Sequence, residues 1–187
     1  MEKAARGLKE EWSIDLDLSR GQVDDIETIL AGVEMFKSLA EDELLQVERI
    51  VHPRTYHRQE VIVRQGDPGV GMYIIQSGSA DVLLEVEDGG VIPLARLGER
   101  QFFGEMSLLD GAPRAASVVA VERTLVIGFF RADLMDLIAR SPQLGFKIVF
   151  RLSQLMNARL RETLQEFRDA QQTLRALEGV REGGDRD

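Results

Sequence analysis

Residues 103–118 read FGEMSLLDGAPRAASV, and this stretch interrupts a long run of strand-like sequence. The segment from Glu105 to Leu109 follows Gly104 and stops before Gly111, which predicts a helix of one or two turns. The first N–H groups of such a helix lack intrahelical partners, and glycine lets the backbone approach a ligand closely. We therefore expect an anion to bind at the start of this short helix.

Two charged residues in the same stretch indicate the chemistry of the expected site. Arg114 lies nine residues after Glu105, and a guanidinium can hold a phosphate through two parallel hydrogen bonds. Ala115 and Ala116 follow it, and their small side chains leave the backbone amides accessible. A carboxylate near a phosphate would repel the ligand unless it faces a neutral sugar. The combination predicts a nucleotide held by its ribose and its phosphate together.

The stretch resembles the phosphate-binding cassette of the cyclic nucleotide-binding domain family. That family includes the regulatory subunits of cAMP-dependent protein kinase, the cyclic-nucleotide-gated channels and the bacterial catabolite activator protein. Its pattern is roughly F-G-E-[aliphatic]-[AS]-L-[LI]-x-x-x-P-R-A-A-[TS]-V, which FGEMSLLDGAPRAASV matches at nearly every position. The resemblance covers about residues 33–160 and includes FKSL at 36–39 and VIVRQGDPGVGMYIIQSG at 61–78.

This resemblance implies a role for each matching residue. Glu105 would accept a hydrogen bond from the ribose 2′-hydroxyl, and Arg114 would pair with the cyclic phosphate. The family often has Thr directly after the arginine where cGMP is preferred, so Ala115 favours cAMP, with cGMP still possible. Asn157 or Arg159 of a C-terminal helix would cover the base, and no metal is expected. The backbone groups that would complete the site belong to Gly104, Met106, Ser107, Ala115 and Ala116.

The sequence on both sides of the cassette has the pattern of strands. From about His52 to Phe130, apolar and polar residues tend to alternate, as in Ala80, Val82 and Leu84, and turn signals fall at short intervals. We expect about seven or eight strands in a small antiparallel sandwich or barrel. With the resemblance, the predicted fold is α+β: an antiparallel, jelly-roll-like β-roll (a double-stranded β-helix) flanked by N-terminal helices and a long C-terminal helix.

Helical periodicity precedes and follows the strands. Apolar positions predict one helix over residues 23–33, a second around 39–47 and a third over 132–139. Pro142 suits the first turn of a long helix that would run to about Leu177, roughly 50 Å. Because the second half of this helix outruns so small a barrel, its apolar stripe predicts a homodimer. The stripe consists of Leu144, Ile148, Leu152, Leu155, Leu160, Leu164, Phe167, Gln171 and Leu174.

These patterns divide the chain into four parts. Residues 1–20 are read as an N-terminal tail and 21–140 as the nucleotide-binding domain with its N-terminal helices. Residues 141–178 form the long helix, expected to act as lid and dimerisation element, and 179–187 a flexible tail. About ten residues remain after Leu177, too few for a helix-turn-helix. We therefore expect a stand-alone member of bacterial type, without a DNA-binding domain.

Composition and the remaining candidate residues argue against other classes of protein. Asp and Glu outnumber Lys and Arg by 32 to 23, giving a net charge of −9 and disfavouring nucleic acid as a partner. No apolar run approaches the ~20 residues of a membrane helix, and the expected location is cytoplasmic. His52 and His57 would face opposite sides of a strand, and no cysteine accompanies them. Ser107 and Ser117 lack a nearby His in the sequence, so we expect no enzyme.

The predicted function is that of a regulatory sensor. A cyclic nucleotide, preferably cAMP, would bind at the cassette and rearrange the C-terminal helix, which would signal to an unknown protein effector. The alternative is a ligand-free dimeric scaffold whose pocket is degenerate or specific for another ligand, such as cGMP or a cyclic dinucleotide. A surface ion pair between Glu105 and Arg114 is the simplest competing interpretation of the two charges.

Overall fold

The computed structural model describes residues 25–183, with side chains described for residues 25–175. The chain divides into two compact units, residues 1–147 and 148–187, and all described strands belong to the first. The elements in chain order are α2 (Ile26–Gly32), α3 (Glu41–Glu48), β1 (His52–Tyr56), β2 (Val61–Val63), β3 (Gly71–Ser77), β4 (Ala80–Glu85), β5 (Val91–Leu97), β6 (Phe102–Phe103), α4 (Glu105–Asp110), β7 (Ser117–Ala120), β8 (Thr124–Phe130), α5 (Arg131–Arg140) and α6 (Pro142–Gly183).

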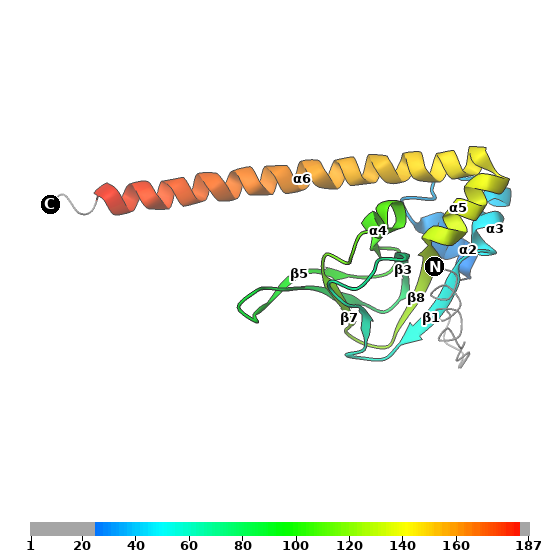
Figure 1. The fold of residues 1–187 in the computed structure, drawn as a ribbon, viewed down its shortest axis with the longest axis horizontal. Helices are drawn as coiled ribbons and strands as arrows, with labels where there is room; N and C mark the ends of the chain where they lie inside the picture. Colours follow the sequence, from blue (N-terminus) through cyan, green and yellow to red (C-terminus); the bar gives the residue numbers. More distant parts are fainter. Residues whose placement is uncertain (1–24, 184–187) are drawn as a thin grey trace. The chain divides into compact units, whose positions relative to one another are not determined.

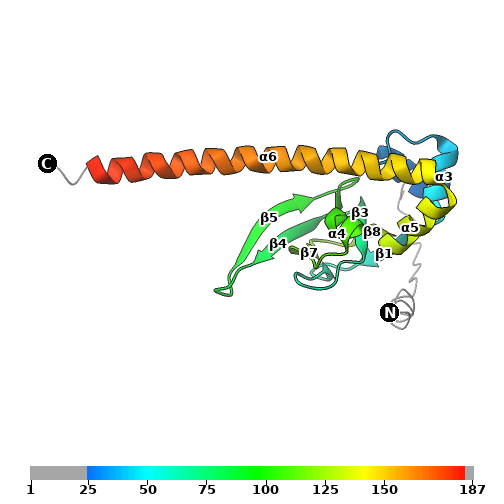
Figure 2. The ribbon, with the colours of Figure 1, turned by 45° about the horizontal axis from the view of Figure 1, so that its top comes forward.

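The strands form two four-stranded antiparallel sheets, ordered β1-β8-β3-β6 and β2-β7-β4-β5 (Figures 1 and 2). Side chains from both sheets pack into one buried cluster. The fold is an antiparallel β-roll flanked by helices, as predicted, and the one helix between strands, α4, lies where the cassette interrupts the strand pattern. The buried cluster consists of Tyr56, Ile62, Val63, Tyr73, Ile75, Ala80, Phe103, Val118, Ala120 and Val126.

Strand β8 is buried on both faces, which the predicted alternation did not anticipate. Val126 belongs to the cluster between the sheets. On the opposite face, Phe129 meets Phe36 edge to face, with ring centroids 6.1 Å apart, and Phe36 lies in the turn between α2 and α3. The helical segments thus cover the outer face of this sheet, so β8 reads as a nearly continuous apolar run.

The alternation of apolar Ala80, Val82 and Leu84 with polar residues, which Leu83 already breaks in the sequence, does not give β4 one buried and one exposed face. Ala80 is buried, but the next four residues are all half-buried. The pairing of β4 with β5 shifts register between Val82 and Leu83, which marks a bulge at the one residue that broke the sequence pattern. Strand β5 is exposed along almost its whole length, so β4 has little cover on either face toward the end of this hairpin.

The helices match the expected segments, with shifted ends. Helix α2 begins at Ile26, whereas Val23 and the expected tail over residues 1–20 lie outside the described residues. Pro142 is the first residue of α6, as predicted. The helix continues to Gly183, so residues 179–183 are helical rather than part of a flexible tail. A single glycine costs a helix only about 1 kcal/mol relative to alanine, too little to end it at Gly179.

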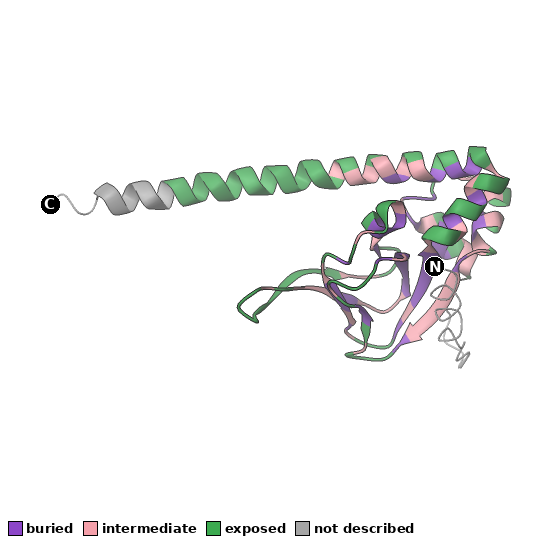
Figure 3. Ribbon diagram, in the orientation of Figure 1, coloured by how far each residue is buried: buried purple, intermediate pink, exposed green. Residues whose placement is uncertain are grey.

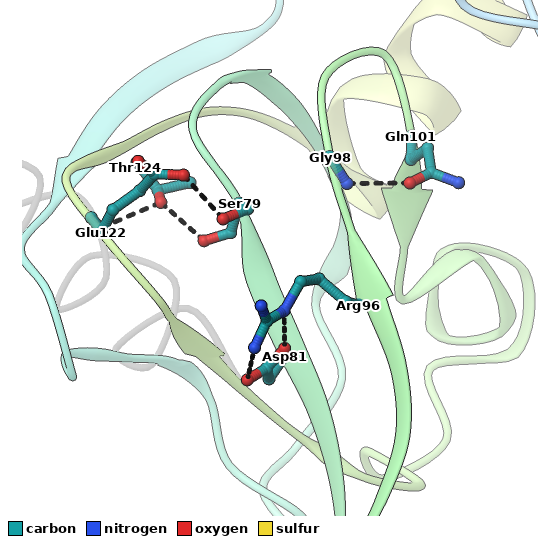
Figure 4. A network of polar contacts seen from close by, with 7 residues as sticks. All are labelled: Ser79, Asp81, Arg96, Gly98, Gln101, Glu122 and Thr124. Atoms are coloured by element: carbon teal, nitrogen blue, oxygen red, sulfur yellow. Dashed lines mark hydrogen bonds and ion pairs between the residues drawn. The ribbon is translucent and has the colours of Figure 1, made fainter.

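Polar contacts hold the turns at one end of the second sheet (Figure 4). Ser79 donates a hydrogen bond to the carboxylate of Glu122 at 2.7 Å, and the Thr124 hydroxyl lies 2.9 Å from the carbonyl oxygen of Ser79. Arg96 of β5 binds Asp81 of β4 through two nitrogens and lowers the pKa of that carboxyl. This last pair is exposed, so it contributes little to stability.

The two tyrosines of the chain make the fold sensitive to alkali. Burial raises the pKa of Tyr56 from 10.0 to about 12, and it also raises the pKa of Tyr73. Since the unfolded chain loses these protons first, the stability that they contribute is complete below pH 10 and is lost as pH rises toward 12. For Tyr56 alone the loss is roughly 2–3 kcal/mol. We expect phenolate absorbance near 295 nm to appear together with unfolding; a titration near pH 10 with the fold intact would contradict this.

Candidate functional site

Helix α4 lies between two glycines with left-handed backbone conformations. Gly104 has φ +79° and precedes the helix, and Gly111 has φ +70° and follows it. A Cβ atom on Gly104 would lie 2.3 Å from the Nη1 atom of Arg114. A Cβ atom on Gly111 would have no neighbouring atom within 4 Å. The first glycine is therefore required both by its backbone and by the arginine packed against it.

Arg114 is buried, with 6% of its surface exposed. Its Nη1 atom donates a hydrogen bond to the carbonyl oxygen of Gly71 at 2.6 Å and lies 3.4 Å from that of Gly104. The guanidinium carbon lies 5.5 Å from the centroid of the Tyr73 ring, within reach of a cation–π contact. These contacts hold the side chain in one place.

The backbone of Arg114 is held by the turn between β2 and β3. Its N–H donates to the carbonyl oxygen of Asp67, and its own carbonyl oxygen accepts from the N–H of Gly66, both at 2.9 Å. Gln65 anchors this turn in its place: its N–H donates to the hydroxyl of Ser117, and its side chain exchanges two hydrogen bonds with the backbone of Glu85. The cassette and the glycine-punctuated strands therefore support each other.

Glu105 begins α4 and is 9% exposed. Burial lowers the pKa of the Arg114 guanidinium, and the nearby charges of Tyr73 and Glu105 oppose that shift. The guanidinium stays charged at neutral pH, because the ordinary pKa of an arginine side chain lies far above that pH. Glu105 and Arg114 are thus opposite charges that are both buried, and an exposed surface ion pair does not describe them.

The predicted backbone positions lie within a few residues of Glu105 or Arg114 along the chain. Met106 is exposed, Ala115 is exposed, and Ala116 and Gly104 are half-buried, all close in sequence to the two charges. Ser107 is buried, and its hydroxyl donates to the carbonyl oxygen of Ala112 at 3.0 Å. Its side chain therefore closes the loop after α4, which leaves only its backbone for a ligand.

Asn157 is the one predicted site residue outside the unit that contains the cassette. It belongs to the second unit, on α6, and is exposed. Its side-chain amide donates to the carbonyl oxygen of Ser153 on the same helix, at 3.0 Å. A role of Asn157 at the base stays a prediction.

Three residues at this site were not identified from the sequence. The carbonyl oxygen of Gly71 accepts from Arg114, and the ring of Tyr73 lies beside the guanidinium. A Cβ atom on Gly69 would lie 2.1 Å from the Ser107 hydroxyl, so this position also needs glycine. The only signal for them was the series of glycines in residues 61–78. It indicated that the backbone approaches another group closely, but it did not identify that group.

The other candidate residues have structural partners. His52 lies 2.9 Å from a carboxylate oxygen of Asp133 and stacks on Phe130. Ser117 donates to the carboxylate of Glu85 at 3.0 Å. Between residues 25 and 183, no group of three or more His, Asp or Glu residues is placed to hold a metal ion. Over the same residues, no helix has the length and apolar character to cross a membrane.

Comparison with known proteins identifies relatives of the strand-rich part. The family model described as the cyclic nucleotide-binding domain matches residues 53–141. The cyclic AMP receptor protein of Thermus thermophilus is 37% identical over 133 residues, which are 71% of this chain and 60% of that protein. The type II regulatory subunit of cAMP-dependent protein kinase of Drosophila melanogaster is 35% identical over 103 residues, 55% of this chain and 27% of that protein.

Solved structures agree with these matches. A cyclic nucleotide-binding domain from Methylobacillus flagellatus has a TM-score of 0.67 and 31% identity, and the match covers 75% of this chain and 79% of that one. The chain spans less than two thirds of the length of either curated relative named above.

Proposed function

Because this chain belongs to the cyclic nucleotide-binding domain family, we propose that it is a regulatory sensor that binds cAMP in preference to cGMP. Arg114 pairs with the cyclic phosphate, and Glu105 accepts a hydrogen bond from the ribose 2′-hydroxyl. The backbone amides next to these two residues complete the contacts to the phosphate. The protein acts by binding, without catalysis.

The observation that carries the proposal is the burial of both Glu105 and Arg114 within the cassette. Burying a guanidinium and a carboxylate costs desolvation energy, which a ligand offering both an anion and a hydroxyl can repay. Arg114 already has carbonyl partners at Gly71 and Gly104. It therefore meets the phosphate in a fixed position, and little side-chain entropy is lost on binding.

The nature of the signal follows from the long helix. We propose that the nucleotide favours one arrangement of α6 over another, and that a protein effector senses the difference. The chain acts as a homodimer through α6 and works in the cytoplasm. An idle scaffold with the same helix remains the competing function, and nucleotide binding separates the two.

The proposal is tested by calorimetric titration of the whole chain with cAMP, cGMP and 5′-AMP. We expect cAMP to bind most tightly and 5′-AMP, which lacks the cyclic ester, to bind far more weakly. Ligand at a hundred times its dissociation constant should stabilise the fold by about 2.7 kcal/mol in thermal unfolding. If none of the three nucleotides produces heat or stabilisation, the sensor function is refuted and the scaffold is favoured.

Ala115 is expected to set the choice between the two bases. Replacing Ala115 by Thr adds a hydroxyl that can accept a hydrogen bond from the amino group of guanine, a group that adenine lacks at this position. We expect the affinity for cGMP to rise roughly fivefold relative to cAMP, from about 1 kcal/mol for one hydrogen bond. Ala115 is exposed, so the fold should tolerate the change.

The matched control is Ala115→Val, which has nearly the shape of threonine without its hydroxyl. It should leave the ratio of cGMP to cAMP affinity unchanged. A ratio that moves equally in both variants would mean that side-chain size, and not the hydroxyl, selects the base.

A further inference from the structure

Tyr73 lies on β3 and is buried, with 6% of its surface exposed. Figure 3 shows β3 among the buried strands of the roll. The central carbon of the Arg114 guanidinium lies 5.5 Å from the centroid of the tyrosine ring. Burial raises the pKa of Tyr73, while the charge of Arg114 and a hydrogen bond with its side chain oppose that shift. Both the ring and the hydroxyl of Tyr73 therefore interact with Arg114.

Two phenylalanines hold the ring of Tyr73 in place. Phe103 of β6 pairs directly with Tyr73, and the two rings stack with their centroids 5.4 Å apart. Phe130 meets the tyrosine ring edge to face, with centroids 6.2 Å apart. Phe103 also directly precedes Gly104, the glycine against which Arg114 packs. The ring of Tyr73 is thus a fixed surface beside the cassette.

The carbonyl contacts of Arg114 fix the position of its guanidinium more firmly than its orientation. The carbonyl oxygens of Gly71 and Gly104 both contact the same nitrogen, Nη1. A planar group held at one atom can still turn about that atom. Bidentate binding of a phosphate requires two N–H groups to point at the anion together. An aromatic ring beside the guanidinium attracts the cation and limits the orientations that its plane can adopt.

We infer that Tyr73 is a positioning residue that orients the guanidinium of Arg114 for the cyclic phosphate. Its ring stabilises the buried positive charge, and its hydroxyl oxygen accepts a hydrogen bond from the guanidinium, which can only donate. Tyr73 acts through Arg114 and needs no contact of its own with the ligand. This inference rests on the proposed function and adds a second side chain to its phosphate site.

Tyr56 is a matched control for Tyr73. Both belong to the buried cluster between the sheets, and Tyr56 is 3% exposed. Its ring also lies beside a guanidinium, 4.7 Å from the central carbon of Arg54. Arg54 lies on β1, where its side chain pairs with Glu60. Tyr56→Leu therefore removes a buried ring and its contact with a cation, but it leaves the contact between Tyr73 and Arg114 in place.

A double-mutant cycle without nucleotide first tests the contact itself. Urea unfolding gives the unfolding equilibrium constant of the wild type, Tyr73→Leu, Arg114→Ala and the double variant. We expect the increase in the double variant to fall short of the product of the two single increases by roughly five- to thirtyfold. The same cycle with Tyr56→Leu should be multiplicative within about twofold. A multiplicative cycle for Tyr73 and Arg114 would overturn the inference, whether or not the protein binds a nucleotide.

Calorimetric titration with cAMP then tests the role at the phosphate. Tyr73→Leu should weaken binding roughly five- to thirtyfold. Tyr73→Phe, which keeps the ring and loses the hydroxyl, should weaken it only about threefold. Tyr56→Leu should bind as the wild type does. If Tyr73→Leu does not fold, Tyr73→Met replaces it in both experiments with the same expected results, because the flexible side chain of methionine fits irregular gaps in a core.

The loss of affinity must also depend on Arg114. In an Arg114→Ala background, Tyr73→Leu should weaken cAMP binding no further, because the group that it positions is absent. An equal loss in both backgrounds would show that Tyr73 only supports the shape of the pocket, and it would overturn the inference.

Two results separate this inference from the proposed function. A wild-type protein that binds no cAMP would refute the sensor function and, with it, the role of Tyr73 at the phosphate. A wild type that binds cAMP, with a Tyr73→Leu variant that binds equally well, would overturn the role of Tyr73 and leave the sensor function in place.

Discussion

Replacing Arg114 by alanine is expected to weaken cAMP binding by about 2–4 kcal/mol, roughly 30- to 1,000-fold. The variant removes the only side chain proposed to carry positive charge to the cyclic phosphate, and it leaves the buried carboxylate of Glu105 beside the ligand. Isothermal calorimetry with cAMP measures the loss. Arg114→Lys keeps the charge but not the paired geometry, so we expect its affinity to fall between those of the wild type and the alanine variant.

Two controls separate the loss of contact from damage to the fold. Arg123 is exposed in the turn between β7 and β8, and Arg123→Ala should bind cAMP as the wild type does. Arg114→Ala should also unfold more easily in urea, by about 1–2 kcal/mol, because the carbonyl oxygens of Gly71 and Gly104 lose their donor. Wild-type affinity in a folded Arg114→Ala protein would show that the phosphate binds elsewhere.

Replacing Gly104 by alanine is expected to impair binding although it replaces no side chain that is proposed to contact the ligand. Alanine at φ +79° is strained by about 1 kcal/mol. Its Cβ would also lie 2.3 Å from Nη1 of Arg114, so the guanidinium must shift. A displacement of this size at a charged contact should lower cAMP affinity by about 1–3 kcal/mol, roughly 5- to 150-fold.

Gly111→Ala is a closely matched control for this change. Gly111 ends the same helix with φ +70°, and a Cβ there would meet nothing within 4 Å. Both variants should lose the stability that alanine costs in a left-handed conformation, with a larger loss for Gly104→Ala because of its clash, but only Gly104→Ala should lose affinity. Equal losses of affinity would mean that the integrity of α4, and not the position of the Arg114 guanidinium, governs binding.

The sequence predicted the parts of the site that lie close together along the chain. Glu105, the short helix and Arg114 fall within ten residues, so residue type and spacing alone located them. A small antiparallel sandwich or barrel was predicted for a similar reason, since alternation and turn residues act locally, and the family resemblance specified it as a β-roll. The contacts that distant residues make to Arg114 could not be predicted in this way. The acceptor for Arg114 is a backbone carbonyl at Gly71, and no residue type marks a carbonyl as an acceptor.

The errors in the fold also arose from contacts between distant residues. The burial of β8 on its second face depends on Phe36, which lies almost a hundred residues earlier in the chain. The bulge in β4 is a property of its pairing with β5. Helix α6 passes Gly179 because the local cost of one glycine is small. The first two features depend on a contact with a distant segment, and the third depends on the size of a free-energy cost. A pattern of residue types along one strand or helix contains neither.

The tie between Arg114 and residues 66–71 has a mechanical consequence. The backbone of Arg114 is bonded to Gly66 and Asp67, and its guanidinium to Gly71. The backbone and the guanidinium of Arg114 are therefore both bonded to residues 66–71. We expect any displacement of that segment to move the guanidinium with it, and with the guanidinium the anion that we propose it binds.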